Sequence, residues 1–485
     1  MPRKKDKPAN VQIKTTSMVL NNLPDKDKEH LRKLCYHAAR LYNVALYNVK
    51  QYRRFYTSVT DTLNGFPVYA QIEDYILPET AEYVNEQLNA FYHVGQPLKP
   101  GLNAYRNYHL VKANHNYKIL PGQTGMTALN KLDDNYKSFF ALLKTCPEMR
   151  PRPPKYIAKD FHGTIYFPKQ VISKPKDSEN TINLPLSRVM KAEGYTTITL
   201  TLPPYIDRTR INEVRIMPYP KKTAKNLKAF IAYETDKQTN VWDYERYLSI
   251  DMGLDNLATC VDVQGGHNFI ICGRWLKSVN QWWNKESSRL KSIRDIQNNA
   301  AKSIRYDTYK LNQIQQKRNA RVTDYMHKAA QHIVNYCMTN NVGNIVVGWN
   351  PEMKQRMELG KKTNQAFTQI PFAKLRQNIK TRCDEHGLRY AENEESYTSK
   401  CSYLDGEEVC KHGAYKGRRV KRGLFRTSTG QTINADVNGA LNIYRKVTED
   451  YSAPTESQTK GCLSNPVRIK IYEYNERRGD ENKAI

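Results

Sequence analysis

The chain has 485 residues, and its 76 lysines and arginines outnumber its 48 aspartates and glutamates, which gives a formal net charge of +28. So large a positive charge argues against an enzyme for neutral ligands and predicts a polyanionic partner; nucleic acid, acidic proteins and anionic membrane surfaces all have the right sign. No run of about 18 apolar residues exists to cross a bilayer, and the basic N-terminus lacks the apolar stretch of a secretory signal.

The first half of the chain reads as a helical region placed between β-strands. Residues 1–24 are basic and then strand-like, and residues 25–56 carry apolar side chains at the three-to-four spacing of a helix. Further helical segments follow as far as a proline-rich stretch. Residues 161–236 then alternate between apolar and polar, which predicts antiparallel strands of a small barrel or sandwich. The N-terminal segment is expected to add one more strand to it.

The second half has the pattern of an α/β domain with a mixed sheet. Consecutive strands are predicted from residue 247, followed by a long helical region over about residues 285–340. NIVVGWN (344–350) reads as a short buried strand, and a helix from Pro371 to His386 is expected to end at Gly387. LRYAENEE supplies the next strand.

Acidic residues end two of these strands and begin the last helix. Asp251 follows the apolar strand residues in LSID, Glu394 and Glu395 end LRYAENEE, and Asp436 stands at the head of a helix of small residues. Carboxylates gathered from distant segments repel one another unless divalent cations neutralise them. Neighbouring strand residues face opposite ways, so only one of the two glutamates can join such a site. Metal-dependent phosphodiester cleavage is the resulting hypothesis.

Each acid also has a simpler interpretation. Asp251 could be a turn residue, Asp436 could cap its helix, and the two glutamates could be a charged strand end in solvent. Taken one at a time, these alternatives remain open.

A short, very basic insert separates the glutamates from Asp436. Cys401, Cys410 and His412 lie in it, but they lack a CxxC pair and a fourth ligand, so we expect no zinc. Nine scattered cysteines predict reduced thiols in a cytosolic protein. The basic block KGRRVKRGLFR has aromatic neighbours and is predicted to be a nucleic-acid clamp. Its candidate contacts are Lys416, Arg418, Arg419, Lys421 and Arg422.

The motifs GLDNLAT, EESYTSKCS, RRVKRGLF and INADVNGALNI resemble those of the TnpB family, which are transposon-encoded, RNA-guided DNA endonucleases related to miniature type V CRISPR effectors. The resemblance spans nearly the whole chain. It implies an RNase H-like (RuvC) nuclease domain and a β-barrel wedge domain that is interrupted by a helical recognition domain. The expected boundaries are 1–24 and 160–245 for the wedge, 25–159 for the recognition domain, 246–395 and 431–448 for the nuclease, 396–430 for a target-nucleic-acid-binding insert with a degenerate zinc ribbon, and 449–485 for a C-terminal tail.

The resemblance also implies a catalytic set. Asp251 and Asp436 match the first and last acids of the family's site, whereas the glutamate expected at the end of NIVVGWN is replaced by Gly348. Many members carry the acid before the YTSK motif instead, which here is Glu395; Glu352 is the alternative. Two Mg²⁺ ions about 4 Å apart, which Mn²⁺ could replace, would be bridged by Asp251 and completed by the other two acids.

The implied partners are an ω-type guide RNA and double-stranded and single-stranded target DNA, cut beside a short motif that the protein reads. Basic helices would hold the phosphates, with Arg40, Arg53, Arg54, Arg318 and Arg321 as candidates. We expect a monomer bound to one RNA in a bacterial or archaeal cytosol, with phage as another origin, and no membrane contact. A CRISPR-associated miniature nuclease and a non-cleaving RNA-guided repressor are the alternatives.

Overall fold

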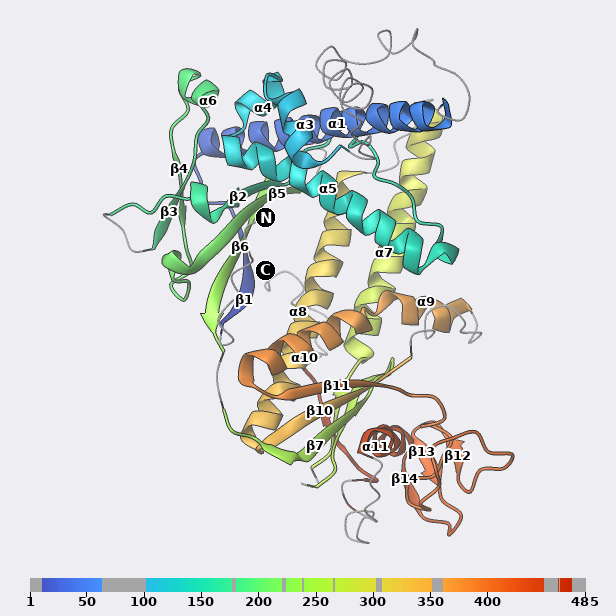
Figure 1. Ribbon diagram of the computed structural model, residues 1–485. Coiled ribbons are helices and arrows are strands. Elements are labelled where there is room, and N and C mark those ends of the chain that lie inside the picture. Colours follow the sequence, from blue (N-terminus) through green and yellow to red (C-terminus); the bar gives the residue numbers. More distant parts are fainter. Residues whose placement is uncertain are drawn as a thin grey trace. The chain divides into compact units, whose positions relative to one another are not determined.

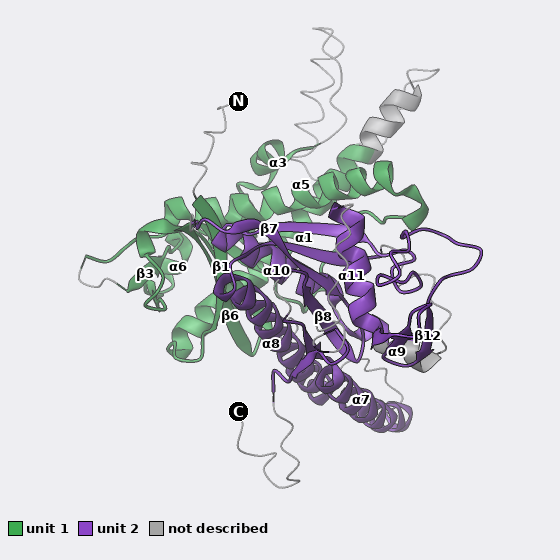
Figure 2. Cartoon of the chain, turned by 90° about the horizontal axis from the view of Figure 1, so that it is seen from below, with its two compact units in different colours: residues 1–236 green, residues 237–485 purple. Residues whose placement is uncertain are grey.

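The computed structural model describes residues 11–62, 102–176, 180–219, 224–237, 240–264, 267–301, 308–350, 361–448, 461 and 463–472. The chain forms two compact units, residues 1–236 and 237–485, which are coloured separately in Figure 2. The finer division into wedge, recognition, nuclease, insert and tail segments stays a prediction. In the part of the chain that is described, no helix is both long enough and apolar enough to cross a membrane.

The first unit contains a four-stranded antiparallel sheet with the order β1-β6-β5-β2 and a separate two-stranded pair. The strands are β1 (Val11–Val19), β2 (Ile165–Pro168), β3 (Thr181–Leu184), β4 (Ile198–Thr201), β5 (Ile211–Tyr219) and β6 (Asn226–Asp236). β1 pairs with β6 along its whole length, so the N-terminal segment does add a strand to the later sheet. The barrel that was expected here is not confirmed, because the described strands form two sheets.

The helices of this unit lie against its sheet (Figure 1), and residues of both form one hydrophobic core. The helices are α1 (Asp25–Thr62), α3 (Ala104–Val111), α4 (His115–Ile119), α5 (Gly122–Thr145) and α6 (Arg188–Ala192). Leu34 and Leu41 of α1 and Leu129 of α5 are fully buried together with Phe167 and Val214 of the sheet. The apolar face predicted for residues 25–56 therefore does cover a core, and the helix continues to Thr62.

The second unit is built on a six-stranded mixed sheet with the order β11-β10-β7-β8-β9-β15. Its strands are β7 (Asp243–Asp251), β8 (Asn256–Asp262), β9 (Phe269–Cys272), β10 (Val342–Trp349), β11 (Arg389–Glu394) and β15 (Val467–Ile469). Only β8 runs against the other five. The carboxyl ends of those five strands consequently lie at one edge of the sheet, the edge at which α/β proteins bind their ligands.

Helices cover both faces of this sheet (Figure 1). They are α7 (Arg274–Ala300), α8 (Tyr309–Thr339), α9 (Lys361–Gln369), α10 (Phe372–His386) and α11 (Ala435–Thr448). Leu248 and Ile250 of β7 pack against α8 and α10, whereas the Ser249 hydroxyl between them donates a 2.6 Å hydrogen bond to the Ala440 carbonyl of α11. One face therefore belongs to α7, α8 and α10, and the other belongs to α11. The mixed α/β fold predicted for this half is confirmed.

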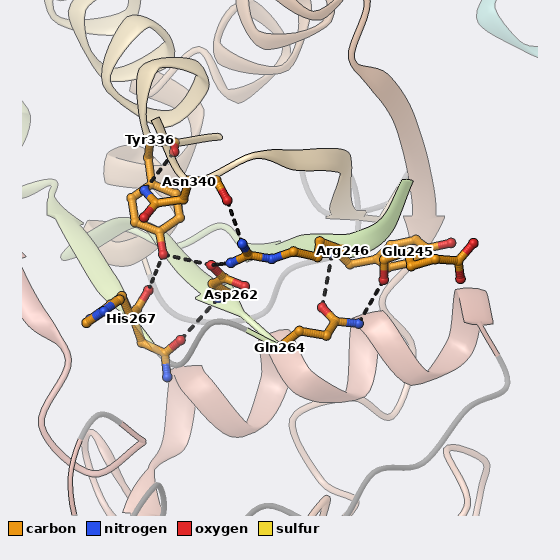
Figure 3. A network of polar contacts seen from close by, with 9 residues as sticks. Glu245, Arg246, Asp262, Gln264, His267, Tyr336 and Asn340 are labelled. Atoms are coloured by element: carbon orange, nitrogen blue, oxygen red, sulfur yellow. Dashed lines mark hydrogen bonds and ion pairs between the residues drawn. The ribbon is translucent and has the colours of Figure 1, made fainter. Parts of the chain in front are cut away.

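A buried ion pair fixes the amino-terminal edge of the sheet (Figure 3). The Arg246 guanidinium donates to the carboxylate of Asp262, 2.8 Å away, and to the Asn340 carbonyl at 2.6 Å. The Tyr336 hydroxyl donates to the same carboxylate at 2.9 Å, and Asp262 is 2% exposed. This network joins β7, β8 and α8 at the edge opposite to the strand ends that carry the acids.

The insert between β11 and α11 forms a small three-stranded antiparallel sheet. Its strands are β12 (Arg418–Lys421), β13 (Leu424–Arg426) and β14 (Thr432–Asn434), and β14 leads directly into α11. Phe425 of β13 is buried with Tyr403, Ile433 and Val437. The insert is thus anchored on the α11 side of the large sheet.

Candidate active site at the carboxyl edge of the mixed sheet

Three carboxylates meet on the α11 side of the carboxyl edge. Asp251 is the last residue of β7, Glu395 directly follows β11, and Asp436 is the second residue of α11. β10 pairs in parallel with both β7 and β11, which brings the ends of these strands to the same level. The three acids singled out in the sequence are therefore neighbours in space.

Two glycines make this convergence possible. A Cβ atom at Gly439 of α11 would lie 2.9 Å from Oδ2 of Asp251, so only glycine lets the helix approach this carboxylate so closely. A Cβ atom at Gly348 of β10 would collide with the Ile443 side chain and lie 3.3 Å from Oε2 of Glu395. The Glu395 carboxylate thus lies beside the place where a side chain at position 348 would begin.

The electrostatics of the cluster match its geometry. The pKa of Asp251 is raised well above its ordinary range, first by burial and then by the negative charges of Glu395 and Asp436; Arg419 partly offsets this. Burial also raises the pKa of Glu395, with a smaller effect from Glu394. Negative charges gathered around the buried Asp251 carboxyl create a site that favours a cation.

Asp436 does not cap helix α11, which was the alternative interpretation of this residue. Asn434 caps α11 instead, since its Oδ1 accepts the amides of Asp436 at 3.0 Å and Val437 at 3.3 Å. The Asp436 carboxylate accepts hydrogen bonds from Asn256 Nδ2 at 2.6 Å and from Arg419 Nη2 at 3.1 Å. The N-cap interpretation of Asp436 is therefore wrong.

A fourth carboxylate beside the site was not predicted from the sequence. Asp255, in the turn after β7, pairs with Lys277 of α7 at 2.5 Å and with Arg422 of the insert. Asn256, the next residue, was missed as well, although it holds Asp436. Both residues lie in the GLDNLAT motif, which is the sequence feature that could have indicated their place beside the site.

The donor chemistry of the three acids suits a hard divalent cation, which prefers carboxylate oxygens. Among the residues that the structure describes, however, no group of three or more His, Cys, Asp or Glu side chains is already arranged to hold a metal ion. Arg419 supplies the positive charge at Asp436. A metal ion bound by Asp436 would compete with this guanidinium for the carboxylate.

Buried asparagines of α11 connect the site to the YTSKC loop. Asn438 accepts the Tyr403 amide at 3.0 Å and donates to the Cys401 carbonyl at 2.8 Å. Asn442 donates to the carbonyls of Thr398 and Cys401, both at 2.8 Å. The segment that follows Glu395 is therefore held against the helix that carries Asp436.

The basic insert divides into two groups of side chains. Arg418 and Lys421 are exposed on β12, and the Lys416 ammonium lies 3.4 Å from the Asp405 carbonyl. Arg419 and Arg422 instead pair with Asp436 and Asp255. Two of the five predicted clamp residues are thus directed at carboxylates of the site.

The described helical arginines that were predicted to contact phosphates interact with other groups of the protein. Arg40 donates to the carbonyls of residues 158, 159 and 161 at 2.7–3.2 Å, and the Arg53 guanidinium lies over the rings of residues 136 and 140. Arg318 bonds to Asn280 at 2.8 Å and to the carbonyl of residue 369 at 2.5 Å, whereas Arg321 lies over the Trp282 ring. The Arg54 side chain and Glu352 lie outside the described residues.

A buried carboxylate organises the loop that contains Cys401, Cys410 and His412. Glu407 is 3% exposed and accepts the backbone amides of Ser402 at 2.8 Å and Lys416 at 2.9 Å. Cys410 Sγ lies 3.4 Å from His412 Nε2, and Cys401 Sγ donates to the Cys410 carbonyl. The two ends of the loop are thus tied by Glu407.

Sequence comparisons find two matching families. Residues 230–354 match the OrfB_IS605 family, described as a probable transposase. Residues 372–443 match the TNB domain of Cas12f1-like proteins. These two ranges contain Asp251, Glu395 and Asp436.

Individual proteins show the same likeness. TnpB-like protein ORF457 of Acidianus two-tailed virus is 26% identical over 204 residues, a match that spans 41% of this chain and 41% of that protein. A solved Cas12f1–sgRNA–target DNA complex covers 87% of this chain and 83% of its own, with a TM-score of 0.50 and 14% identity. CasPhi-2 (Cas12j) bound to crRNA and DNA has a TM-score of 0.39 and 10% identity, with 92% and 93% of the two chains covered. The likeness to Cas12f1 shows a shared fold.

Proposed function

Because this chain is a member of the TnpB family, we infer that it is an RNA-guided, metal-dependent DNA endonuclease of the TnpB and miniature type V class. One observation carries the inference. Asp251, Glu395 and Asp436, from three distant segments, converge at the carboxyl edge of a mixed sheet, where burial and then the charges of Glu395 and Asp436 raise the pKa of Asp251.

The residues of the site have distinct roles in this proposal. Asp251, which feels the charges of both other acids, would hold the metal together with Glu395 and Asp436. Bound Mg²⁺ or Mn²⁺ would activate water and stabilise the leaving oxygen. Asn256 orients the Asp436 carboxylate through its 2.6 Å hydrogen bond. Arg419 neutralises the same carboxylate and would be free to contact a substrate phosphate once the metal is bound.

Guide RNA and target DNA are the proposed partners. The net charge of +28 calls for a polyanion, and the insert exposes Arg418 and Lys421 next to the carboxylates. The Cas12f1 structure with the matching fold was solved with an sgRNA and target DNA. A short motif beside the target would be read by protein and the remaining sequence by base pairing.

One observation favours a second function, a non-cleaving RNA-guided repressor. Asp436 is paired with Arg419, and the described residues contain no ready-made group of three metal ligands. A protein that only binds DNA could keep this arrangement permanently. A CRISPR-associated nuclease would share the fold and the chemistry, and the neighbouring genes would distinguish it from a transposon protein.

A cleavage assay separates these functions. The full chain would be purified with the RNA that it retains, and plasmid cleavage would be measured with Mg²⁺ and with EDTA. We expect Asp251→Ala and Asp436→Ala to lower the cleavage rate by about 100-fold or more while target binding stays near that of the parent protein, because a lost ligand removes several kcal/mol of transition-state stabilisation.

Asp324→Ala is the matched control, since this aspartate pairs with Lys328 on the exposed surface of α8. It should cut at the parental rate. If the parent protein binds its target but never cuts with Mg²⁺ or Mn²⁺, the repressor is the correct function. If either site variant cuts as fast as the parent, that residue is not part of the site.

A further inference from the structure

An aromatic pocket of about 240 Å³ lies in the second unit, away from the carboxylates described above. Its walls are mostly apolar and come from the start of α7, the middle of α8 and the segment after β15. The residues that carry the argument are Arg274, Trp275, Ser278, Tyr325, Lys470 and Tyr472.

Three aromatic rings form the inner wall of this pocket. Trp275 stacks on Tyr325 with ring centres 5.2 Å apart and planes 11° apart, and Tyr472 lies 4.7 Å from Trp275. The Tyr325 hydroxyl donates to the Cys272 carbonyl, which fixes the ring at the end of β9. Lys328 donates to the Tyr472 hydroxyl at 2.9 Å and orients that ring.

The outer rim of the pocket is polar and positively charged. Arg274, Ser278 and Lys470 are all exposed, and no carboxylate is among the described residues that line the pocket. Stacked rings with cations at the rim match a nucleotide, whose base is flat and aromatic and whose phosphates are anionic.

The topology places this pocket at the same sheet edge as the acids. β9 and β15 run parallel to β7, and the pocket begins where β9 and β15 end. β9 is two strands from β7, a lateral separation of about 10 Å at the usual strand spacing. The pocket lies on the α7 and α8 face of the sheet and the acids lie on the α11 face, so a strand that reaches both passes over this edge.

A chain of hydrogen bonds also joins the pocket to the acids. Arg468, two residues before Lys470, donates to Asn256 at 3.0 Å, and Asn256 donates to Asp436 at 2.6 Å. The Gly273 amide, immediately before Arg274, donates to the Asp255 carbonyl at 2.7 Å. Asn256 and its neighbour therefore link the two sites directly.

We propose that this pocket takes one unpaired base of the DNA strand that crosses the carboxylates, with the adjoining phosphates on Arg274 and Lys470. The inference rests on the proposed function for the identity of the strand. Stacking on Trp275 and Tyr472 holds this strand close to the cut, so that the reacting phosphate stays in place. Because aromatic stacking accepts every base, the pocket positions the strand without reading its sequence.

Binding of short strands tests the pocket without any guide or cleavage. A single-stranded DNA 15-mer, its RNA counterpart and an abasic DNA strand with the same phosphates would be titrated against the full chain. Tyr472→Leu removes a stacking ring and keeps an apolar side chain. Ser278→Leu fills the pocket with an aliphatic side chain from an exposed position, so folding is preserved and no new stacking ring is added. Both should weaken binding of base-bearing DNA by about 5- to 150-fold and leave binding of the abasic strand unchanged.

Arg289→Gln is the control, because this arginine is exposed on α7 and pairs with Glu286 in the same helix. It should change the affinity for the natural and abasic strands by the same factor. Scanning 5-iodouracil along the target DNA in the complex with guide RNA, with cleavage silenced by Asp251→Ala, should then give crosslinks to Trp275 or Tyr472 at one position near the cut.

Each other outcome overturns the inference. Equal binding of natural and abasic strands by the parent protein would exclude a base pocket. A base preference that survives Ser278→Leu would place the stacking elsewhere. If no position of the target DNA crosslinks to Trp275 or Tyr472, while 5-iodouracil placed in the guide RNA does, the pocket holds the guide and not the target strand. None of these results would alter cleavage by the parent protein, so failure here is distinguishable from failure of the proposed nuclease function.

Discussion

The third acid is the residue at which this chain departs from the pattern implied by its resemblance to TnpB proteins. Gly348 stands at the strand end where a glutamate is expected, and Glu395 reaches the same region from the neighbouring strand β11. Glu395 is partly buried and raises the pKa of Asp251, whereas the Glu394 side chain is 54% exposed and lies 3.8 Å from Lys446. The structure therefore gives the two adjacent glutamates different surroundings.

We predict that Glu395→Ala lowers the cleavage rate by about 100-fold or more, because a ligand that supplies several kcal/mol of stabilisation is lost. Glu394→Ala should keep most of the activity, since its carboxylate faces Lys446 and solvent. Single-turnover cleavage with saturating guide RNA is the measurement. If only Glu394→Ala lost activity, Glu394 and not Glu395 would be the third acid. If only Glu352→Ala lost activity, the third acid would be Glu352, in the segment after β10.

Sequence reasoning could identify these acids because strand ends and strand parity are local properties. Asp251 ends a strand, Glu395 directly follows one, and Asp436 lies at the start of a helix. The hydrogen-bond partners of Asp436 could not be predicted in this way, because they are not local in sequence. Arg419 reaches it from a separate small sheet, and Asn256 is 180 residues away in the chain.

At the scale of elements, α11 organises the site through its asparagines as well as through Asp436. We predict that Asn438→Ala lowers the free energy of unfolding of the second unit by about 2–4 kcal/mol. The substitution leaves the buried Tyr403 amide and Cys401 carbonyl without their partner. Thermal and urea unfolding of the full chain would measure the change.

Val447→Ala on the same helix is the control, because this side chain is 38% exposed. It should shift stability by less than about 0.5 kcal/mol. Equal effects of the two substitutions would mean that the asparagine contacts add nothing beyond helix packing.

The insert yields a second prediction at this scale. Glu407 ties together the loop that a zinc ion would organise, so we expect purified protein to hold less than about one zinc per chain. Glu407→Gln should destabilise the insert, since a neutral amide is a weaker acceptor for two amides than a carboxylate. Atomic absorption after dialysis would report the metal content. Stoichiometric zinc that resists dialysis would show that Cys401, Cys410 and His412 find a further ligand.

The limits of some elements could not be predicted from the sequence. The helical region expected over residues 285–340 contains two helices, and the first begins at Arg274. The apolar run NFIICGRWL hides this start, because strand and helix are both apolar there and Gly273 offers no capping side chain. The separate β3–β4 pair could not be predicted either. Alternation of apolar and polar residues predicts strands, but it does not show which strands pair.

At the scale of the whole molecule, a charge of +28 overstates the number of arginines that are available to phosphates. Arg40, Arg318 and Arg419 each have internal partners, while Arg418 and Lys421 are exposed. Composition gives the sign of the partner's charge, but only the fold determines which cations remain free to contact it.

Salt dependence measures that number directly. We predict that affinity for RNA falls by roughly 10³-fold or more between 50 and 200 mM salt, as six or more phosphate contacts require. Arg418→Gln and Lys421→Gln should each reduce the slope of log K against log salt by about one, because each removes a phosphate contact. Arg40→Gln should leave the slope unchanged and lower stability instead, since its guanidinium holds three backbone carbonyls. An RNA affinity that is insensitive to salt would contradict the electrostatic interpretation of the whole surface, and a reduced slope in Arg40→Gln would show that this arginine exchanges its internal partners for phosphate.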